Sequence, residues 1–439
     1  MKDRLRYFVL AYFMLWVMIS SVAQIPLALD SIEYEDTDSL RQGFIMFETS
    51  DENYIKTDSD TFVEYDFIRY AANVIQLNGD DWTELQKKYA STDRGQFSIV
   101  HAGDSHLQAD IMTGEIRRRM QGKHGDAGRG LIVPFKLAGT NEPLDYRFAI
   151  NRRFTSSKVM KRPWKTEMDF SGVGLSPSVH SFELTFDTEP RGESLFMFAR
   201  IYHAGELAIT DVTDRDGRKI GFTLDRQNED PYTDIFLDRS VSCANVSCYA
   251  PSTVTLHGVM LSKERNGLFY HVIGNNGACY STYNAVPGFG RDVETLYPDL
   301  IIVSLGTNEA FGKFNSEDFY ASIDKFVSEL RFNSPDAKIL LTTPKECQRR
   351  VRKGRGRSRT TTYQIVENCR LVRDVIVRYA RDHSVALYDW FEVSGGEGIS
   401  SEWVSNSLLS RDRVHNTETG YLLAADLFHS ALERALTNP

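Results

Sequence analysis

The pattern of apolar and polar residues marks five short apolar runs that have the length of buried strands. They lie at residues 97–102, 268–273, 300–305, 339–343 and 385–388. Uninterrupted apolar runs of this length are typical of strands buried on both faces of a parallel sheet. Segments with helical spacing lie between most of them, at residues 107–120, 319–332 and 365–379. Strands that alternate with helices predict an α/β fold with a doubly wound, five-stranded parallel sheet.

The interval between the first two runs is far longer than a helical crossover requires. Residues 150–262 contain short segments with the texture of strands, such as 182–186, 207–212 and 254–256. Asp216-Gly217 gives a hairpin signal within this interval. Several short strands separated by turns predict a β-sandwich or jelly-roll domain inserted into the α/β domain.

The beginning of the chain has the pattern of an export signal. Three basic residues precede an apolar run at residues 7–19, and Ser-Val-Ala at residues 21–23 supplies the small residues of a cleavage site. An apolar helix of this length is too short for a hydrocarbon core of about 30 Å. We therefore expect an exported protein of the periplasm, cell envelope or medium, with no stable membrane span after the signal is removed.

These patterns divide the chain into five parts. We expect a signal peptide at 1–23, an acidic flexible lead-in at 24–66, the first part of the α/β domain at 67–149, the inserted β domain at 150–262 and the second part of the α/β domain at 263–439.

Composition narrows the class of protein. Of 439 residues, 41% are hydrophobic and 25% are charged, as in a globular protein, and the net charge of -9 argues against a nucleic-acid binder. The number of cysteines, five, is odd, which does not suit a disulfide framework. Cys243 and Cys248 either staple a hairpin or are small buried thiols, and the sequence favours neither. Because no zinc-site spacing is present, we expect no metal, and we expect no cofactor.

Four short motifs place chemically active residues at the ends of predicted strands or near the C-terminus. They are Gly103-Asp104-Ser105-His106, Gly274-Asn275-Asn276-Gly277, Gly306-Thr307-Asn308-Glu309 and Asp412-Arg413-Val414-His415. The carboxyl ends of strands are where open α/β sheets bind ligands. Taken singly, each motif has an ordinary explanation as a helix cap, a turn or an exposed loop.

Together, the motifs supply the parts that nucleophilic catalysis requires. Ser105 offers a hydroxyl, while its backbone N–H, that of Gly277 and the Asn308 amide are candidate donors to an oxyanion. Asp412 can hold the Nδ1–H of His415, which leaves Nε2 to take the serine proton. A Gly-x-Ser-x-Gly elbow is absent from the sequence, which argues against the α/β-hydrolase class.

The four motifs resemble the conserved blocks of the SGNH/GDSL hydrolase superfamily. The correspondence is Gly103-Asp104-Ser105 to the serine block, Gly277 to the glycine block, Gly306-Thr307-Asn308 to the asparagine block, and Asp412 with His415 to the D-x-x-H block. The resemblance covers residues 90–147 and 262–437, and Glu309 departs from it because the commonest pattern has Asp there. It implies a flavodoxin-like hydrolase domain and a carboxylic ester hydrolase with a serine nucleophile.

A narrower resemblance is to the Gram-negative peptidoglycan O-acetylesterases, which carry a β domain like a carbohydrate-binding module after the serine block. The phrases at 99–110, 128–131, 274–278 and 412–415 carry this likeness. It implies an O-acetylated glycan as substrate, with peptidoglycan the first choice, and an acetyl-enzyme on Ser105. Asp412 and His415 would complete the triad, and Ser105, Gly277 and Asn308 would form the oxyanion hole.

Other reactive residues have weaker claims. Adjacent side chains on a helix diverge, so we expect His106 to line the rim or to contact substrate. We expect Asp110 to be a surface carboxylate and Cys279 a packed thiol. The basic run at 345–359 is either a solvated mobile loop or a surface that attracts an anionic polymer such as peptidoglycan.

Three other functions stay open from the sequence. The enzyme could be an acetylesterase of xylan or another polysaccharide, or an O-acetyltransferase that passes the acyl group to a sugar hydroxyl. A non-catalytic glycan-binding protein of the cell envelope is the alternative outside enzymes, although the complete set of Ser, Gly, Asn, Asp and His argues against it.

Overall fold

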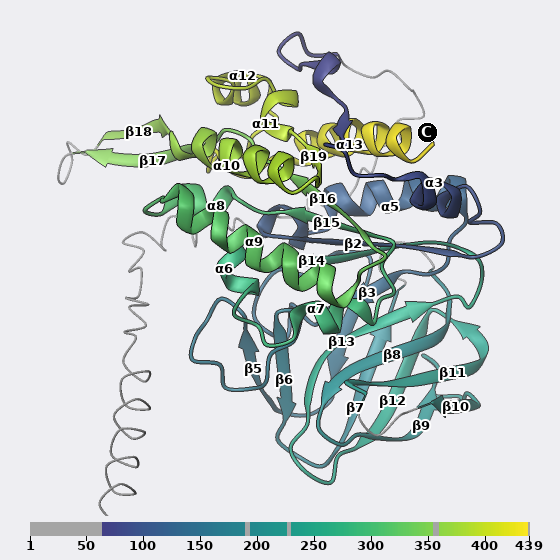
Figure 1. Cartoon of the computed structure of the whole chain (residues 1–439). Helices are drawn as coiled ribbons and strands as arrows, with labels where there is room; N and C mark the ends of the chain where they lie inside the picture. The colour runs from purple at the N-terminus through teal and green to yellow at the C-terminus, as the bar shows by residue number, and fades with distance from the viewer. Residues whose placement is uncertain (1–63, 189–193, 226–229, 354–359, 438–439) are drawn as a thin grey trace, which may run out of the picture. The chain divides into compact units, whose positions relative to one another are not determined.

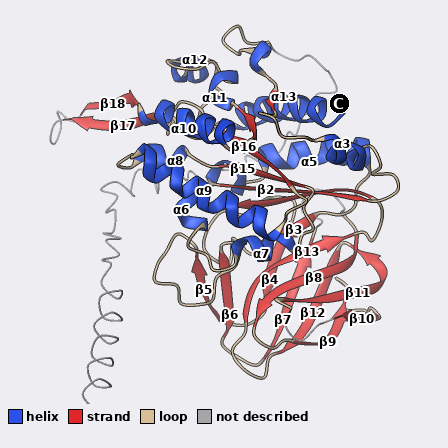
Figure 2. Ribbon diagram, in the orientation of Figure 1, coloured by secondary structure: helices blue, strands red, loops and turns tan. Residues whose placement is uncertain are grey.

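The computed structural model describes residues 64–188, 194–225, 230–353 and 360–437. The predicted signal peptide and nearly all of the predicted lead-in lie outside these residues. The described part has an α/β portion and a β portion, coloured by secondary structure in Figure 2.

The α/β portion is built on a six-stranded sheet (Figure 1). Its strands, in spatial order, are β1 (Ile75–Gln76), β19 (Ala386–Tyr388), β16 (Lys338–Thr342), β15 (Leu300–Ser304), β2 (Gln96–Gly103) and β14 (Gly267–Gly274). The predicted apolar runs fall in β2, β14, β15, β16 and β19, which pair in parallel. The sequence did not predict β1, a short edge strand that pairs with β19 in the antiparallel direction.

The order of the parallel strands determines where a ligand site can form. The first strand of the chain in this set, β2, lies between β14, the second, and β15, the third. The connection that follows β2 leads to β14 on one side, and the connection that follows β15 leads to β16 on the other side, so the topological switch point of this flavodoxin-like sheet lies between β2 and β15. Ser105 follows β2 directly and Asn308 follows β15, so both lie at this switch point.

Helices cover both faces of the sheet because alternate strand residues point to opposite faces. In β15, Leu300 and Ile302 belong to one apolar cluster, and Ile301 and Val303 belong to the other. The first cluster includes buried residues of α3 (Thr83–Tyr89), α5 (Ile111–His124) and α13 (Glu418–Thr437). The second includes those of α7 (Phe289–Glu294), α9 (Ser316–Asn333) and α10 (Asn368–Asp382).

Short helices and one 3-10 turn lie mainly around the ends of the strands. They are η1 (Tyr70–Ala72), α4 (Ser105–Gln108), α6 (Tyr280–Tyr283), α8 (Thr307–Phe311), α11 (Trp390–Val393) and α12 (Ser400–Ser405).

The β portion consists of two antiparallel sheets. One has the order β10 (Phe222–Asp225), β11 (Tyr232–Val241), β8 (Phe196–Ala204), β13 (Thr255–Ser262), β6 (Val173–Pro177) and β5 (Phe154–Lys158), and β3 (Gly130–Ile132) also pairs with β13. The other has the order β4 (Arg147–Ile150), β7 (Ser181–Asp187), β12 (Cys243–Tyr249) and β9 (Ala208–Thr213). Along β7, the buried apolar side chains alternate, at Phe182, Leu184 and Phe186, and join the core shared by both sheets.

The β portion and the α/β portion share one apolar core and several polar contacts. Arg200 of β8 donates to the Thr295 carbonyl at 2.7 Å, and Asn275, just after β14, donates to the Ser171 carbonyl at 3.1 Å. Gly172 has no room for a side chain, because a Cβ there would lie 2.4 Å from Asn275. The loop beside the oxyanion candidates is therefore packed directly against the β portion.

Most of the described part of the basic run forms a strand instead of a loop. Residues Gln348–Lys353 form β17, which pairs in the antiparallel direction with β18 (Thr360–Ile365). Lys345, the first residue of the run, is buried rather than solvated. Figure 1 shows this two-stranded hairpin extending beyond α10.

Candidate active site

Ser105 is presented by a sharp turn between β2 and α4. Asp104 is the N-cap of α4, and its carboxylate accepts a hydrogen bond from the His106 backbone N–H at 2.9 Å. A side chain at Gly103 would collide with the Ser304 carbonyl of β15 at 2.6 Å, so glycine allows the two strands to approach at this point. The turn therefore places the Ser105 hydroxyl at the carboxyl edge of the sheet.

The structure brings Ser105, His415 and Asp412 into one hydrogen-bonded chain. Ser105 Oγ lies 2.8 Å from His415 Nε2, and His415 Nδ1 lies 2.6 Å from Asp412 Oδ2. These residues come from the β2–α4 turn and from the loop before α13, more than three hundred positions apart. The geometry is that of a hydroxyl, a base and an orienting carboxylate.

The loop that carries Asp412 is organised around its carboxylate. Asp412 Oδ1 accepts hydrogen bonds from the backbone N–H groups of Val414 and His415 at 2.9 and 3.0 Å, and from the Ser410 hydroxyl at 2.7 Å. Burial opposes the ionised form, but these donors and His415 hold the pKa of Asp412 well below its usual range. Asp412 is therefore a carboxylate at neutral pH.

The imidazole of His415 is held by the same interactions. Burial lowers its pKa, but the hydrogen bond and the charge of Asp412 outweigh burial and leave the pKa of His415 raised above its ordinary value. The buried ammonium group of Lys345 acts in the opposite direction, since it disfavours a second positive charge nearby. Its own pKa is lowered to about 8 by burial.

The oxyanion candidates lie around Ser105. Gly277 has a φ of 85°, a left-handed conformation that glycine adopts without strain. The Asn308 amide nitrogen lies 3.0 Å from the Ala278 carbonyl and 3.3 Å from Asp104 Oδ2. Asn308 therefore links the turn before Ser105 to the residue after Gly277, so the structure brings these predicted residues into one neighbourhood.

Gln108 is a buried residue that sequence reasoning missed. Its Oε1 accepts from the Asn276 backbone N–H at 2.7 Å, and its Nε2 donates to Thr140 Oγ1 at 2.9 Å and to the Asn141 carbonyl at 2.7 Å. Asn276 also donates from its side chain to Thr140 and Asn141. This network ties the helix of Ser105 to the residue before Gly277, and the sequence contains no signal for it because a glutamine on a short helix is usually exposed.

Glu309 supports the same loop from the other side. Its Oε1 accepts from the Tyr280 backbone N–H at 2.8 Å, and burial raises its pKa to about 7. Glu309 therefore positions the segment after Gly277, although it departs from the commonest family pattern.

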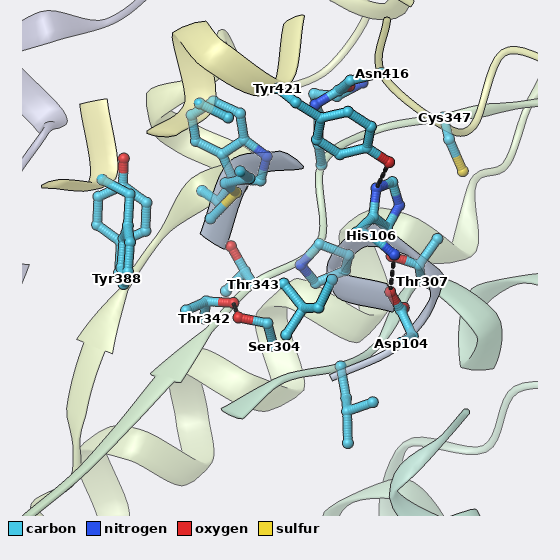
Figure 3. A pocket seen from close by; sticks show the side chains of 18 of the residues that line it. Asp104, His106, Ser304, Thr307, Thr342, Thr343, Cys347, Tyr388, Asn416 and Tyr421 are labelled. Atoms are coloured by element: carbon cyan, nitrogen blue, oxygen red, sulfur yellow. Dashed lines mark hydrogen bonds between the residues drawn. The ribbon is translucent and has the colours of Figure 1, made fainter. Parts of the chain in front are cut away.

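A cavity lies beside the triad, and most of its lining residues are drawn in Figure 3. His106 Nδ1 lies 3.1 Å from the Tyr421 hydroxyl, and burial lowers the pKa of His106 to about 3. His106 thus faces Tyr421 of α13, lines the cavity and is neutral. Lys345 also lines this cavity, and its ammonium group lies 4.6 Å from the centroid of the Trp403 ring.

One prediction about a single residue was wrong. Asp110 is buried instead of lying on the surface, because it pairs with the buried guanidinium groups of Arg117 and Arg129. For Cys243 and Cys248 the structure shows the second of the two alternatives, small buried thiols: both are buried on β12, and neither forms a disulfide bond.

Cys279 is half-buried, and burial raises the pKa of its thiol well above the ordinary value, which makes it a poor nucleophile.

Among the described residues, we find no cluster of three or more metal-ligating side chains. The helices described here include none with the length and apolarity needed to cross a bilayer.

The fold and the site define a hydrolase with a serine, histidine and aspartate at the switch point of a flavodoxin-like sheet. Residues 256–423 match the family model of the GDSL-like lipase/acylhydrolase family. The matched range contains Gly277, Asn308, Asp412 and His415. The chain thus carries a GDSL-like acylhydrolase domain and is a carboxylic ester hydrolase.

Comparison with solved structures shows the fold of nearly the whole described chain. A structure of a peptidoglycan O-acetylesterase is similar over 83% of this chain and 99% of its own, with 20% identity and a TM-score of 0.66. A putative acylhydrolase from Bacteroides fragilis matches over 38% of this chain and 76% of its own (18% identity, TM-score 0.27). A family 3 carbohydrate esterase from Talaromyces cellulolyticus matches over 38% and 73% (16% identity, TM-score 0.28). A search of curated proteins finds no match. The first likeness shows that the chain has the SGNH hydrolase fold.

Proposed function

We propose that this chain is a serine esterase that removes O-acetyl groups from a carbohydrate polymer, with peptidoglycan as the first-choice substrate. The observation that carries the proposal is the continuous hydrogen-bonded chain from Ser105 through His415 to Asp412. The structural likeness to a peptidoglycan O-acetylesterase, which covers 83% of this chain, supports the choice of substrate.

Acylation begins when His415 Nε2 removes the proton from Ser105 Oγ. The oxygen attacks the acetyl carbonyl carbon, and the carbonyl oxygen becomes an oxyanion. The imidazolium that forms is stabilised by the Asp412 carboxylate, which remains ionised. When the tetrahedral intermediate collapses, the C–O bond to the sugar breaks, and the sugar oxygen takes the proton from His415.

Deacylation repeats these steps with water. His415 removes a proton from water, the hydroxide attacks the acetyl-serine, and acetate leaves as Ser105 recovers its proton. The net reaction consumes one water and yields one sugar hydroxyl and one acetic acid, which ionises at neutral pH to acetate and a proton.

The oxyanion would be held by the backbone N–H groups of Ser105 and Gly277 and by the Asn308 amide. The side-chain nitrogen of Asn308 donates to two oxygen atoms, the Ala278 carbonyl and Asp104 Oδ2, and the bond to Asp104 is the longer. We infer that the oxyanion replaces Asp104 as the acceptor during the reaction.

The proposal that the substrate is a polymer rests on the residues that border the site. Met160, in the loop between β5 and β6, would lie 3.3 Å from a side chain at position 277, so a loop of the β portion borders the oxyanion candidates. We propose that residues 150–262 are an insertion in a hydrolase domain formed by 67–149 and 263–439, that β3 and β4 of the first part add strands to the sheets of this insertion, and that the insertion helps to hold a glycan. The pairing of β2 with β14, which flank the insertion in sequence, supports this division.

The proposed substrate favours an extracytoplasmic enzyme, because O-acetylated peptidoglycan lies outside the cytoplasm. Acetate release from O-acetylated peptidoglycan and from acetylated xylan, measured side by side with Ser105→Ala as the control, tests the proposal. We expect release from peptidoglycan to be faster and to be abolished in the control. Release from xylan alone would assign a plant-polysaccharide esterase, and transfer of acetyl to an added sugar at the expense of acetate would assign an acetyltransferase.

A further inference from the structure

The β17–β18 hairpin is attached to the loop that carries the catalytic candidates. The Gln348 backbone N–H donates to the Arg413 carbonyl at 3.1 Å, and the Tyr363 hydroxyl donates to the Arg411 carbonyl at 3.1 Å. The Arg413 guanidinium donates to Gln348 Oε1 at 3.2 Å and lies 4.2 Å from the centroid of the Tyr363 ring. The hairpin base therefore packs on residues that flank Asp412 in sequence.

These contacts define which face of the hairpin is turned toward the site. Side chains alternate along a strand, so Arg350 and Arg352 share the face of Gln348, whereas Arg349 points to the opposite face. Arg350 is directly opposite Tyr363 in the register, and directly opposite residues have side chains on the same face. Arg350 and Arg352 thus lie on the loop-facing side, continuous with Arg411 and Arg413.

The four arginines of this face carry unneutralised charge. Arg350, Arg352 and Arg411 are exposed, and Arg413 is half-buried. Within the described ranges, no carboxylate forms an ion pair with any of them, whereas the exposed Arg118 and Arg378 pair with Glu115 and Glu317. A local cluster of guanidinium groups with no carboxylate partner among the described residues, on a chain with a net charge of -9, is a specific electrostatic feature.

We propose that Arg350, Arg352, Arg411 and Arg413 form a binding track for an anionic polysaccharide, which leads the polymer to Ser105. Guanidinium groups bind carboxylates through paired hydrogen bonds, so a glycan that bears carboxylates along its length fits this face. The choice of a glycan over another polyanion rests on the proposed function, because the track adjoins a site assigned to ester cleavage on a carbohydrate polymer. Binding can nevertheless be measured without catalysis.

The test uses the full chain with Ser105→Ala, so that no turnover occurs. Its binding to polygalacturonate is measured by calorimetry at low and high salt, with neutral dextran and duplex DNA as comparison polymers. We expect binding to polygalacturonate that weakens as salt increases, and about tenfold weaker binding for Arg350→Gln/Arg352→Gln. Arg350→Lys/Arg352→Lys should stay within a few-fold of the parent, and the matched single variant Arg349→Gln, on the opposite face, should lose less affinity than Arg350→Gln.

Three results would overturn the track: equal loss from Arg349→Gln and Arg350→Gln, equal binding to dextran, or tighter binding to DNA than to polygalacturonate. In the active enzyme, Arg350→Gln/Arg352→Gln should keep kcat/KM for p-nitrophenyl acetate, and equal loss on this small ester would mean that the substitutions disturb the His415 loop. Failure of the proposed function has a different signature, since the wild-type enzyme would then release no acetate while the binding differences persist.

Discussion

Asp412 and His415 are joined twice, through the side chain and through the backbone. Asp412 Oδ2 lies 2.6 Å from the imidazole Nδ1, and Oδ1 accepts the His415 backbone N–H at 3.0 Å. One carboxylate therefore fixes both the position of the residue and the orientation of its ring. The proton must reside on Nδ1, which leaves a lone pair on Nε2 directed at Ser105.

This double link makes Asp412→Asn a sharp test of the triad. An amide can present its N–H to Nδ1, which favours the wrong tautomer and removes the charge that stabilises the imidazolium. We expect kcat for acetate release to fall by about 10⁴-fold, with the fold intact. Ser410→Ala, which removes one donor to the same carboxylate, is the matched control and should cost far less. Comparable losses in the two variants would indicate that loop structure, rather than the carboxylate on Nδ1, limits the rate.

The raised pKa of His415 determines the acidic limb of the pH profile. The base works only when neutral, so kcat/KM should fall as the pH decreases through a pKa above the ordinary histidine value of about 6.5. Asp412→Asn removes a contribution that raises this pKa, so residual activity should have its limb at lower pH. Lys345→Met removes a nearby positive charge, so its limb should move to higher pH.

Lys87→Met is the control for that experiment, because Lys87 is an exposed residue of α3 whose partner is Glu84. Its limb should coincide with that of the wild type. Shifts of Asp412→Asn and Lys345→Met in the same direction would contradict the assignment of the limb to His415.

Asn308→Ala examines the side-chain donor to the oxyanion. Removal of one such donor typically costs about 10²–10³-fold in kcat. We expect that loss with little change in KM, because the donor acts on charge that develops in the transition state. Turnover near the wild-type value would remove Asn308 from the mechanism and leave the backbone N–H groups as the only donors.

Gln108→Leu should disturb the position of Gly277 through Asn276. The substitution removes the acceptor of the Asn276 N–H and the donor to Thr140 and Asn141, so we expect kcat to fall about tenfold while KM changes less. Gln121→Leu is a matched control, since Gln121 donates to the carbonyls of Gly128 and Leu268 near the other end of β14. Stability measured for both variants separates general loosening from a catalytic effect.

The elements and residues that could be predicted are those that the order of residue types along the chain makes recognisable. Buried strands such as β15 are uninterrupted apolar runs, and Ser105, Asn308 and His415 belong to reactive residue types near element boundaries. Gln108 gives no such signal, because its role depends on which loop packs above it. The β17–β18 hairpin was missed since both of its faces are polar, so its sequence lacks the alternation that indicates a strand.

Asp110 illustrates the same limit and gives the final prediction. Its position on a helix-forming segment suggested an exposed carboxylate, yet it is 8% exposed and pairs with Arg117 and Arg129, whose remaining partner is Asp145. In Asp110→Asn the side chain keeps its size, and asparagine tolerates the φ of 56° at this position. The buried guanidinium groups of Arg117 and Arg129 then share a single carboxylate, that of Asp145. We expect the free energy of unfolding to fall by about 3–5 kcal/mol, as is typical when one partner of a buried ion pair is removed. Urea denaturation measures the change, and Asp93→Asn, at an exposed position, should leave the free energy within about 0.5 kcal/mol of the wild type. An equally small effect at Asp110 would show that the buried arginines are neutralised without it.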